Sequence, residues 1–350
     1  MNIYDISRKA GVSIATVSRV LNHNSHVSEE TRNRVMNVIQ SSGYVPNAFA
    51  RGLGLNTMKT IGLLCPDASD LYQAQALSFL ERSFREKGYD CLLLCTGADP
   101  VARKAGAANL TGRHVDGMVL MGSSFIEEDE EKNNYIREAA ESMPVALLNG
   151  DYDAPGVYCA LCEDEQASRE AVNAMIHTGR KRILHLYHAL NFSGRKKLIG
   201  YSDALEENGI PYDDNLIRLV DKSRSSTLQV MKMLEQMEKD GIHYDAVFCS
   251  EDILAIGVLK YAKSRGIRIP EDLAVIGYNN SPICLCCEPE MTSVDNRLED
   301  ICKHIAKTMM AVLEGEEGEK RKVFPGRLVC RRTTSSTETE AAETPEGIIE

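Results

Sequence analysis

Two different spacings of apolar residues divide the chain near residue 60. Up to residue 44 the apolar positions recur every three or four residues, as Val35, Val38 and Ile39 do. That repeat is typical of helices that pack along one side. It predicts three short helices, over residues 3–10, 13–21 and 28–43.

From Thr60 onward, short apolar runs bounded by turn residues alternate with longer amphipathic segments. The predicted strands cover residues 61–66, 90–95, 116–122, 144–150, 181–187, 244–250 and 273–278. The predicted helices cover residues 74–87, 166–178, 197–208, 227–239 and 252–265. Strands and helices that alternate in this way form parallel sheets in an α/β fold, and this number of strands suits two sheets better than one.

The segment between these two patterns, residues 46–55, reads as a hinge. Pro46 is well placed to start a helix, but Gly52 and Gly54 each weaken one by roughly 1 kcal/mol. A helix of about ten residues is marginal on its own in water. We therefore expect a hinge helix that forms only when two copies pair on their target. The tail, residues 333–350, has no Lys or Arg and is predicted to be disordered.

Net charge separates the two parts of the chain. The whole chain of 350 residues carries −11, while residues 1–59 hold seven Lys/Arg and three Asp/Glu, a balance of +4, which leaves −15 for the rest. A basic head on an acidic body favours a head that contacts a polyanion. The polar N-terminus and the lack of a long apolar run predict no signal peptide, no membrane span and a cytoplasmic protein.

The candidate chemistry argues against an enzyme. No Gly-rich phosphate loop follows a strand, no G-x-S-x-G elbow occurs, and no pair of histidines has metal-binding spacing, so we expect no cofactor and no metal. The cysteines read mainly as buried apolar residues. Two groups leave a thiol sensor or a metal site open as the alternative: Cys159 with Cys162, and Cys284 with Cys286 and Cys287.

The stretch from Gly11 to Asn22 has the pattern of a helix-turn-helix. On a helix, Val17, Val20 and Leu21 share one face and pack inward, while Ile14, Ala15, Ser18 and Arg19 share the other. Gly11 suits the tight turn that joins this helix to the one before it. The second helix of such a motif enters the DNA major groove, where an arginine pairs with guanine. A plain three-helix bundle is the alternative.

These residues resemble the lactose-repressor (LacI) family of bacterial transcription regulators. The segments that carry the resemblance are IYDISRKAGVSIATVSRVLN, HVSEETRNRV, GYVPNAFARGL and KTIGLL. The resemblance implies a homodimer that binds a palindromic operator, usually as a repressor. It implies the following DNA-contacting residues: Tyr4, Ser13, Ile14, Ala15, Thr16, Ser18, Arg19, Asn22, His26, Ser28, Thr31, Asn47, Ala50 and Leu53. Among them Ile14, Ala15 and Arg19 would read bases, and Leu53 would wedge into the minor groove.

The resemblance also implies the organisation of the body. We expect a helix-turn-helix head over residues 1–45, a hinge helix over 46–58, a body over 59–332 and a disordered acidic tail over 333–350. The body resembles the periplasmic-binding-protein type I fold, with two doubly wound α/β subdomains around a cleft. The chain would cross between them near residues 161–164, 290–293 and 318–323.

The effector site is expected in this cleft, at the carboxyl ends of the strands. The implied residues are Tyr72, Asn149, Asp164, Phe192, Lys197, Lys222, Glu251 and Asn279. Several depart from the family pattern: Asn149 and Asn279 stand where aspartates are usual, and Lys197 where an arginine is usual. Lysine lacks the planar fork of arginine, and asparagine adds donors while it removes charge.

A sugar or oligosaccharide is the effector that this set of side chains favours. Three alternatives stay open: a non-sugar metabolite, a protein co-regulator that binds the outside of the body, and, outside this class, a solute-binding protein. The sequence does not identify the operator, the regulated genes or whether the effector induces or co-represses.

Overall fold

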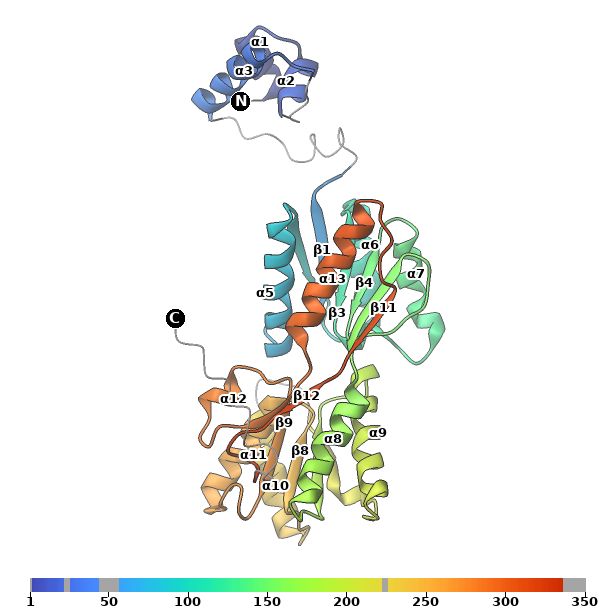
Figure 1. Ribbon diagram of the computed structural model, residues 1–350, viewed down its shortest axis with the longest axis vertical. Coiled ribbons are helices and arrows are strands. Elements are labelled where there is room, and N and C mark those ends of the chain that lie inside the picture. The colour runs from blue at the N-terminus through green and yellow to red at the C-terminus, as the bar shows by residue number, and fades with distance from the viewer. Residues whose placement is uncertain (1, 22–25, 44–56, 222–225, 336–350) are drawn as a thin grey trace.

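The computed structural model describes residues 2–21, 26–43, 57–221 and 226–335. A small helical head stands apart from a body of two lobes stacked end to end (Figure 1). The predicted hinge at residues 46–55 lies outside the described residues. Residues 57 and 58, at the end of the predicted range, are not helical.

The head contains α1 (Ile3–Ala10), α2 (Ile14–Leu21) and α3 (Glu29–Ser42). The side chain of Asn2 accepts a hydrogen bond from the backbone amide of Asp5, and the Asp5 carboxylate accepts one from the backbone amide of Asn2, so a capping box starts α1. Gly11 ends the helix with φ 62°, a conformation that costs glycine little. The inward residues form one small core, comprising Ile6, Ala10, Val17, Val20, Val35 and Ile39.

The first lobe is built on a parallel sheet of six strands in the order β11-β5-β4-β3-β1-β2. Its strands are β1 (Thr60–Cys65), β2 (Asp90–Cys95), β3 (Gly117–Met121), β4 (Val145–Leu148), β5 (Val157–Cys162) and β11 (Arg321–Phe324). Its helices are α5 (Leu71–Glu86), α6 (Pro100–Gly112), α7 (Asn134–Ala140) and α13 (Leu298–Leu313), with short 3-10 turns η1 (Ser123–Phe125) and η2 (Glu130–Asn133). One core lies between the sheet and α5 with α13, and the other between the sheet and α6 with α7.

The second lobe also has a six-stranded sheet, in the order β12-β10-β9-β8-β6-β7, which is parallel except for the antiparallel edge strand β12. Its strands are β6 (Ile183–Tyr187), β7 (Ile217–Leu219), β8 (Ala246–Cys249), β9 (Ala274–Tyr278), β10 (Thr292–Asp295) and β12 (Arg327–Val329). Its helices are α8 (Asp164–His177), α9 (Phe192–Glu207), α10 (Ser226–Lys239), α11 (Asp252–Arg265) and α12 (Ile283–Cys286), with the turn η3 (Asp214–Leu216). Helices α10 and α11 cover one face of the sheet, and α8 and α9 cover the other. The expected pair of doubly wound α/β subdomains is therefore confirmed.

The chain passes between the lobes three times, as Figure 1 shows. The first passage is at residue 163, between β5 and α8, inside the expected range of 161–164. The second lies at residues 296–297, between β10 and α13, and the third at residues 325–326, between β11 and β12. The expected ranges 290–293 and 318–323 are therefore a few residues too early. Both errors arise because β10 and β11 were not recognised as strands.

Strand β10 explains the first of these errors. Its sequence, TSVD, has no apolar run, yet Thr292 and Ser293 are fully buried. Hydrogen bonds satisfy their polar groups: the Ser293 hydroxyl donates to Asp252 Oδ1 at 2.6 Å, and the Thr292 amide donates to Thr333 Oγ1 at 2.9 Å. A pattern search for apolar runs does not find a strand that is buried by hydrogen bonding.

The body also extends past its expected end at residue 332. Thr333 is fully buried and connects β9 to β10. Its backbone oxygen accepts a hydrogen bond from the Val275 amide, and its hydroxyl donates to the Val275 oxygen at 2.6 Å. The same hydroxyl accepts from the Thr292 amide on β10. The tail therefore does not begin at residue 333 as expected. Residues 336–350 lie outside the described residues, and their predicted disorder stays a prediction.

Replacing Thr333 by valine is expected to lower the free energy of unfolding of the body by about 2 kcal/mol. Valine keeps the shape but leaves the Thr292 amide and the Val275 oxygen without their buried hydroxyl partner. Urea unfolding followed by circular dichroism measures the change. Ser335→Ala, an exposed position two residues on, is the control and should change stability by less than about 0.5 kcal/mol.

Candidate functional sites

The outer face of α2 carries the residues expected to read DNA bases. Val17 and Val20 are buried against α1 and α3, whereas Ile14, Ala15 and Arg19 are exposed. Three side chains of different chemistry, an apolar one, a small one and a guanidinium, therefore share one unobstructed helix face. Such a face fits the major groove, where an arginine fork matches guanine and apolar groups meet the thymine methyl.

Hydroxyl side chains fix where α2 and α3 begin. The Ser13 hydroxyl accepts a hydrogen bond from the Thr16 amide at 3.1 Å, and the Ser28 hydroxyl accepts one from the Thr31 amide at 3.3 Å. Ser13 and Ser28 thus act as the N-cap residues of α2 and α3. The other amides of each first turn have no partner within their own helix. Amides at a helix N-terminus bind phosphate well, so the first turns of α2 and α3 are suited to contacts with a phosphate backbone.

At the position of the expected cleft, the contacts between the lobes centre on Asp164, the first residue of α8. Asp164 is 1% exposed and accepts hydrogen bonds from three side chains. The hydroxyls of Ser193 and Tyr278 donate at 2.5 and 2.7 Å, and the amide of Asn149 donates at 3.4 Å. Asn149 belongs to the first lobe and the other two to the second, so this one carboxylate joins both lobes.

Lys197 lies next to this network. Its Nζ donates to the Ser250 oxygen at 3.0 Å and sits 3.7 Å from the centre of the Tyr278 ring. Its side chain is 7% exposed, and in the described part of the chain it makes no ion pair. A buried ammonium with one hydrogen bond retains donors for a ligand. Burial, followed by the nearby Asp164 carboxylate, holds the pKa of Tyr278 well above its usual value, so this phenol stays a donor.

Two asparagines occupy left-handed backbone positions at the ends of strands. Asn149 follows β4 with φ 56°, and Asn279 follows β9 with φ 95°. Asparagine tolerates this region better than most residues. The Asn149 Oδ1 accepts a hydrogen bond from the backbone amide of Cys162 at 3.0 Å. The Asn279 Oδ1 accepts one from the side-chain amide of Asn296 at 2.9 Å. Both side chains are thereby held at the strand ends that border the cleft.

Three buried polar atoms near the cleft have no hydrogen-bond partner within the described residues. They are Tyr72 Oη and Gln73 Oε1, at the start of α5, and Asn296 Oδ1, at the second passage between the lobes. Burial and then the nearby groups Cys302, Asp164 and Cys162 raise the pKa of Tyr72 well above its usual value. Buried polar atoms are nearly always paired in native proteins, so these three are candidates for hydrogen bonds to a bound ligand.

Comparison with known proteins identifies the family. A family model described as bacterial regulatory proteins, lacI family, matches residues 2–47, and one described as a periplasmic binding protein-like domain matches residues 172–334. An HTH-type transcriptional regulator of Lachnoclostridium phytofermentans is 46% identical over 335 residues, which is 96% of this chain and 100% of that protein. The chain belongs to the LacI family. It is a DNA-binding transcriptional regulator and not an enzyme.

Two solved structures extend this comparison. The lac repressor dimer bound to operator and an anti-inducer superposes with a TM-score of 0.85, at 24% identity, over 96% of this chain and 99% of that one. At that identity the match speaks for the fold alone. The transcriptional regulator CelR in complex with cellobiose matches with a TM-score of 0.68 and 27% identity, over 95% of this chain and 99% of that one.

In this LacI-family head, most of the expected DNA-contacting residues lie on the surface. Tyr4, His26 and Ser28 are exposed, and Thr16, Ser18 and Thr31 are half-buried. Tyr4 and Ser13 also line one surface hollow together with Arg8, which the sequence analysis did not select. An exposed cation beside two expected backbone contacts was the signal that could have found Arg8. Four of the expected positions, Asn22, Asn47, Ala50 and Leu53, lie outside the described residues.

In this LacI-family chain, five of the eight expected effector residues lie along the junction between the lobes: Tyr72, Asn149, Asp164, Lys197 and Asn279. Phe192 belongs to the second lobe but packs against an apolar core of the first, so it closes one side of the cleft. Beside it, Arg195 forms an ion pair across the lobes with Glu128 at 3.1 Å. Glu251 is half-buried just beyond the end of β8. Lys222 lies outside the described residues.

Four cleft residues were missed by the sequence analysis. Gln73 neighbours Tyr72, and Ser193 neighbours Phe192, so proximity to selected residues was the available signal for both. Tyr278 directly precedes Asn279, and its burial under Lys197 was not visible in the sequence. Asn296 was missed because β10, which places it, was not recognised.

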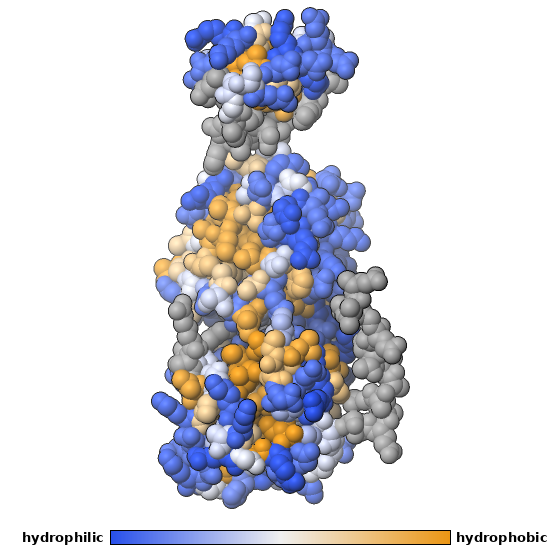
Figure 2. Space-filling model, turned by 90° about the vertical axis from the view of Figure 1, so that its left-hand side faces the viewer, coloured by the Kyte–Doolittle hydropathy of each residue, from blue (hydrophilic) through white to orange (hydrophobic). Residues whose placement is uncertain are grey.

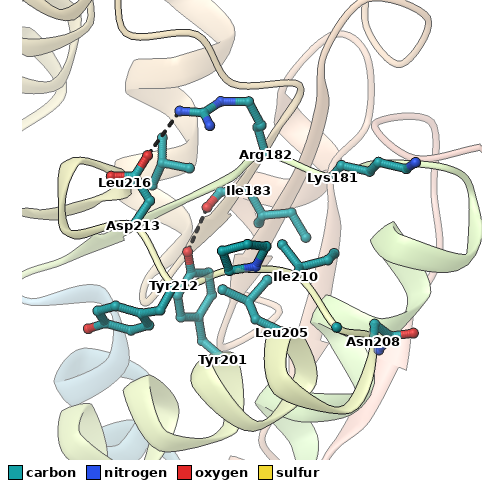
Figure 3. A pocket seen from close by; sticks show the side chains of 12 residues that line it. Lys181, Arg182, Ile183, Tyr201, Leu205, Asn208, Ile210, Tyr212, Asp213 and Leu216 are labelled. Atoms are coloured by element: carbon teal, nitrogen blue, oxygen red, sulfur yellow. Dashed lines mark hydrogen bonds and ion pairs between the residues drawn. The ribbon is translucent and has the colours of Figure 1, made fainter.

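The second lobe also has a surface hollow of about 530 Å³, shown in Figure 3, which is not a candidate effector site. It lies beside the amino end of β6 and the carboxyl end of α9, away from the strand ends that border the cleft. Its polar groups are already engaged: the Tyr201 hydroxyl donates to the Ile183 oxygen at 2.8 Å, and Arg182 pairs with Asp213 at 3.0 Å.

The Cys159-x-x-Cys162 spacing has a structural explanation. Both residues lie on β5, and an odd separation on a strand places side chains on opposite faces. Cys159 accordingly belongs to the core under α7, and Cys162 to the core under α5. The two thiols therefore cannot form a local redox pair or a shared metal site.

Proposed function

We propose that the protein is a dimeric repressor of carbohydrate-utilisation genes, acting in the cytoplasm, whose operator binding is controlled by a sugar or oligosaccharide in the cleft. The observation that carries the effector part is the set of unpaired buried atoms, Tyr72 Oη, Gln73 Oε1 and Asn296 Oδ1. Two of the three are amide oxygens, which accept hydrogen bonds and cannot donate them. A ligand rich in hydroxyl groups supplies the missing donors.

The other groups of the cleft support the same class of ligand. Lys197 and the amide groups of Asn149 and Asn279 donate to hydroxyl oxygens, while Asp164 already has three donors and is not left as a free anion. The chain has no Trp, so stacking against a sugar ring would fall to Tyr72 and Phe192. The cellobiose bound to CelR, a relative with the same body fold, supports a carbohydrate here.

A second copy of the chain would pair along the side of the body that carries α5 and α12. Viewed from this side, apolar residues gather on both lobes (Figure 2). Leu71, at the start of α5, is 41% exposed, and Leu285, on α12, is 60% exposed. Large exposed apolar patches on a protein usually mark an interface. Pairing on this side would hold the two heads at a fixed spacing over the two halves of a palindromic operator.

A thermal-shift screen against mono- and oligosaccharides, sugar phosphates and nucleobases tests the effector. A sugar at 100 times its dissociation constant should stabilise the protein by about 2.7 kcal/mol, which raises the unfolding temperature measurably. Lys197→Ala and Asn279→Ala should each abolish the shift, because both remove donors from the cleft. Lys263→Ala, an exposed lysine on α11, should keep it.

Each outcome of the screen has a clear meaning. A hit that persists in Lys197→Ala and Asn279→Ala would place the effector outside the cleft and overturn the proposed site. A response to phosphorylated or nucleobase compounds alone would replace the sugar with another metabolite. No response to any compound would overturn the carbohydrate effector in favour of a protein co-regulator.

A further inference from the structure

Two cysteines face each other at the ends of neighbouring strands in the first lobe. Cys65 is the last residue of β1 and Cys95 the last of β2, and the parallel register makes them direct partners. Their sulfur atoms are 3.7 Å apart. Both thiols are free, and they differ sharply in environment, since Cys65 is 1% exposed whereas Cys95 is exposed.

We propose that Cys65 and Cys95 form a peroxide-responsive thiol pair that closes to an intramolecular disulfide. Cys95 is the thiol that solvent reaches, and Cys65 is the buried partner that resolves the oxidised intermediate. This site does not depend on the identity of the effector or on the proposed repressor function.

The backbone geometry permits the bond. Neighbouring strands lie about 4.8 Å apart, and disulfides join Cα atoms that are about 4.4–6.8 Å apart. The sulfurs must still approach from 3.7 Å to the bonded distance, which a change of side-chain rotamer and a small strand movement provide.

The chemistry balances with hydrogen peroxide as the oxidant. The Cys95 thiol first loses its proton, and the thiolate attacks one peroxide oxygen. The O–O bond breaks and hydroxide leaves, which takes up that proton, so the products are a sulfenic acid on Cys95 and one water. The Cys65 sulfur then attacks the sulfenic sulfur, the S–O bond breaks, and a second water leaves with the Cys65 proton. Two thiols and one peroxide thus give one disulfide and two waters. Burial raises the pKa of Cys65 to about 12, with a further contribution from Cys95, so Cys65 suits the second step and not the first.

The position of the pair connects it to the effector cleft. Past Cys65 the chain runs through residues 66–70 into α5, whose first turn holds Tyr72 and Gln73. Past Cys95 the amides of Thr96 and Gly97 donate to the oxygens of Cys65 and Pro66, at 2.9 and 2.8 Å. A covalent link at this point would therefore restrain the loop that positions Tyr72.

Peptide mass spectrometry of the full-length protein after equimolar hydrogen peroxide tests the pair. After free thiols are alkylated, we expect a cross-linked peptide that joins β1 to β2 within one chain and is lighter than the two peptides by two hydrogen atoms. Cys95→Ser should abolish it. Cys65→Ala should stop the reaction at a sulfenic acid on Cys95, which a 1,3-dione traps. Cys91→Ser, a half-buried cysteine on the same strand, is the matched control and should react as the wild type does.

Hydrogen exchange tests the effect on the cleft loop. In the oxidised protein, amide exchange over residues 66–73 should slow at least threefold and return to its original rate after dithiothreitol. Oxidised Cys95→Ser should show no slowing. A cross-link between two chains, or oxidation of Cys95 to the sulfinic acid with Cys65 still free, would refute the intramolecular pair. A disulfide that forms without slower exchange over residues 66–73 would refute its connection to the cleft.

Discussion

Replacing Arg19 by alanine is expected to weaken operator binding by about 30-fold or more. Arg19 is the exposed guanidinium on the outer face of α2. A bidentate arginine–guanine pair contributes about 1–3 kcal/mol of discrimination, and a dimer on a palindrome makes it twice, which gives about 2–6 kcal/mol in total. Fluorescence anisotropy with an operator selected from random DNA by the wild-type protein measures the loss.

Two controls separate base reading from charge. Arg19→Lys keeps the cation but loses the planar fork, so it should retain the salt dependence of binding and still lose most of the preference for the operator. Arg34→Ala removes an exposed arginine from α3 and should leave that preference unchanged. Equal losses of affinity for operator and random DNA in Arg19→Ala would contradict a base-reading role.

Replacing Asp164 by alanine is expected to lower the free energy of unfolding of the body by about 3 kcal/mol or more. The substitution leaves the Ser193 and Tyr278 hydroxyls and the Asn149 amide without their buried acceptor. Hydrogen bonds to a charged group each contribute about 1.5–3 kcal/mol, and buried groups left unpaired add to the cost. Because the carboxylate joins residues of both lobes, the sugar response should be lost as well. Urea unfolding and the thermal-shift assay measure the two effects.

Neighbouring substitutions test whether the effect belongs to the Asp164 network. Asp164→Asn keeps one oxygen acceptor and should lose clearly less stability than Asp164→Ala. Glu163→Ala removes an exposed carboxylate that makes no capping hydrogen bond to α8, and it should be nearly neutral. If Glu163→Ala destabilised the body as much as Asp164→Ala does, the cause would lie in the start of α8 and not in the network.

The sequence was most informative where apolar spacing alone decides a structure. The three head helices were predicted to within about one residue at each end, because their apolar stripe and their capping residues agree. The short strands at the sheet edges were not predicted. Strands β7 and β12 have three residues each, too few to show a period. The errors at the second and third passages between the lobes arise at two other short strands, β10 and β11, which have four residues each.

The cleft shows the same contrast between local pattern and long-range contact. Asp164, Lys197 and Asn279 were selected because each sits in a short stretch that resembles a known family. The hydrogen bond from Tyr278 to Asp164 joins residues that are 114 positions apart. The position of Lys197 over the Tyr278 ring also depends on tertiary packing. Contacts between residues so far apart in the sequence leave no mark in any short stretch of it. The residues that were missed are therefore those whose contribution to the site depends on tertiary contacts.

The passage of the chain between the lobes also constrains how the protein is synthesised. The first core needs Leu298, Ile301 and Ile305 from α13, which the ribosome produces after nearly the whole second lobe. The second sheet needs β12, which comes later still. Neither lobe is complete until β11 and β12, close to the end of the described residues, have been translated. A nonsense codon or a stalled ribosome between β10 and α13 would therefore release a head attached to two unfinished cores, which proteases degrade, and not a partly active regulator.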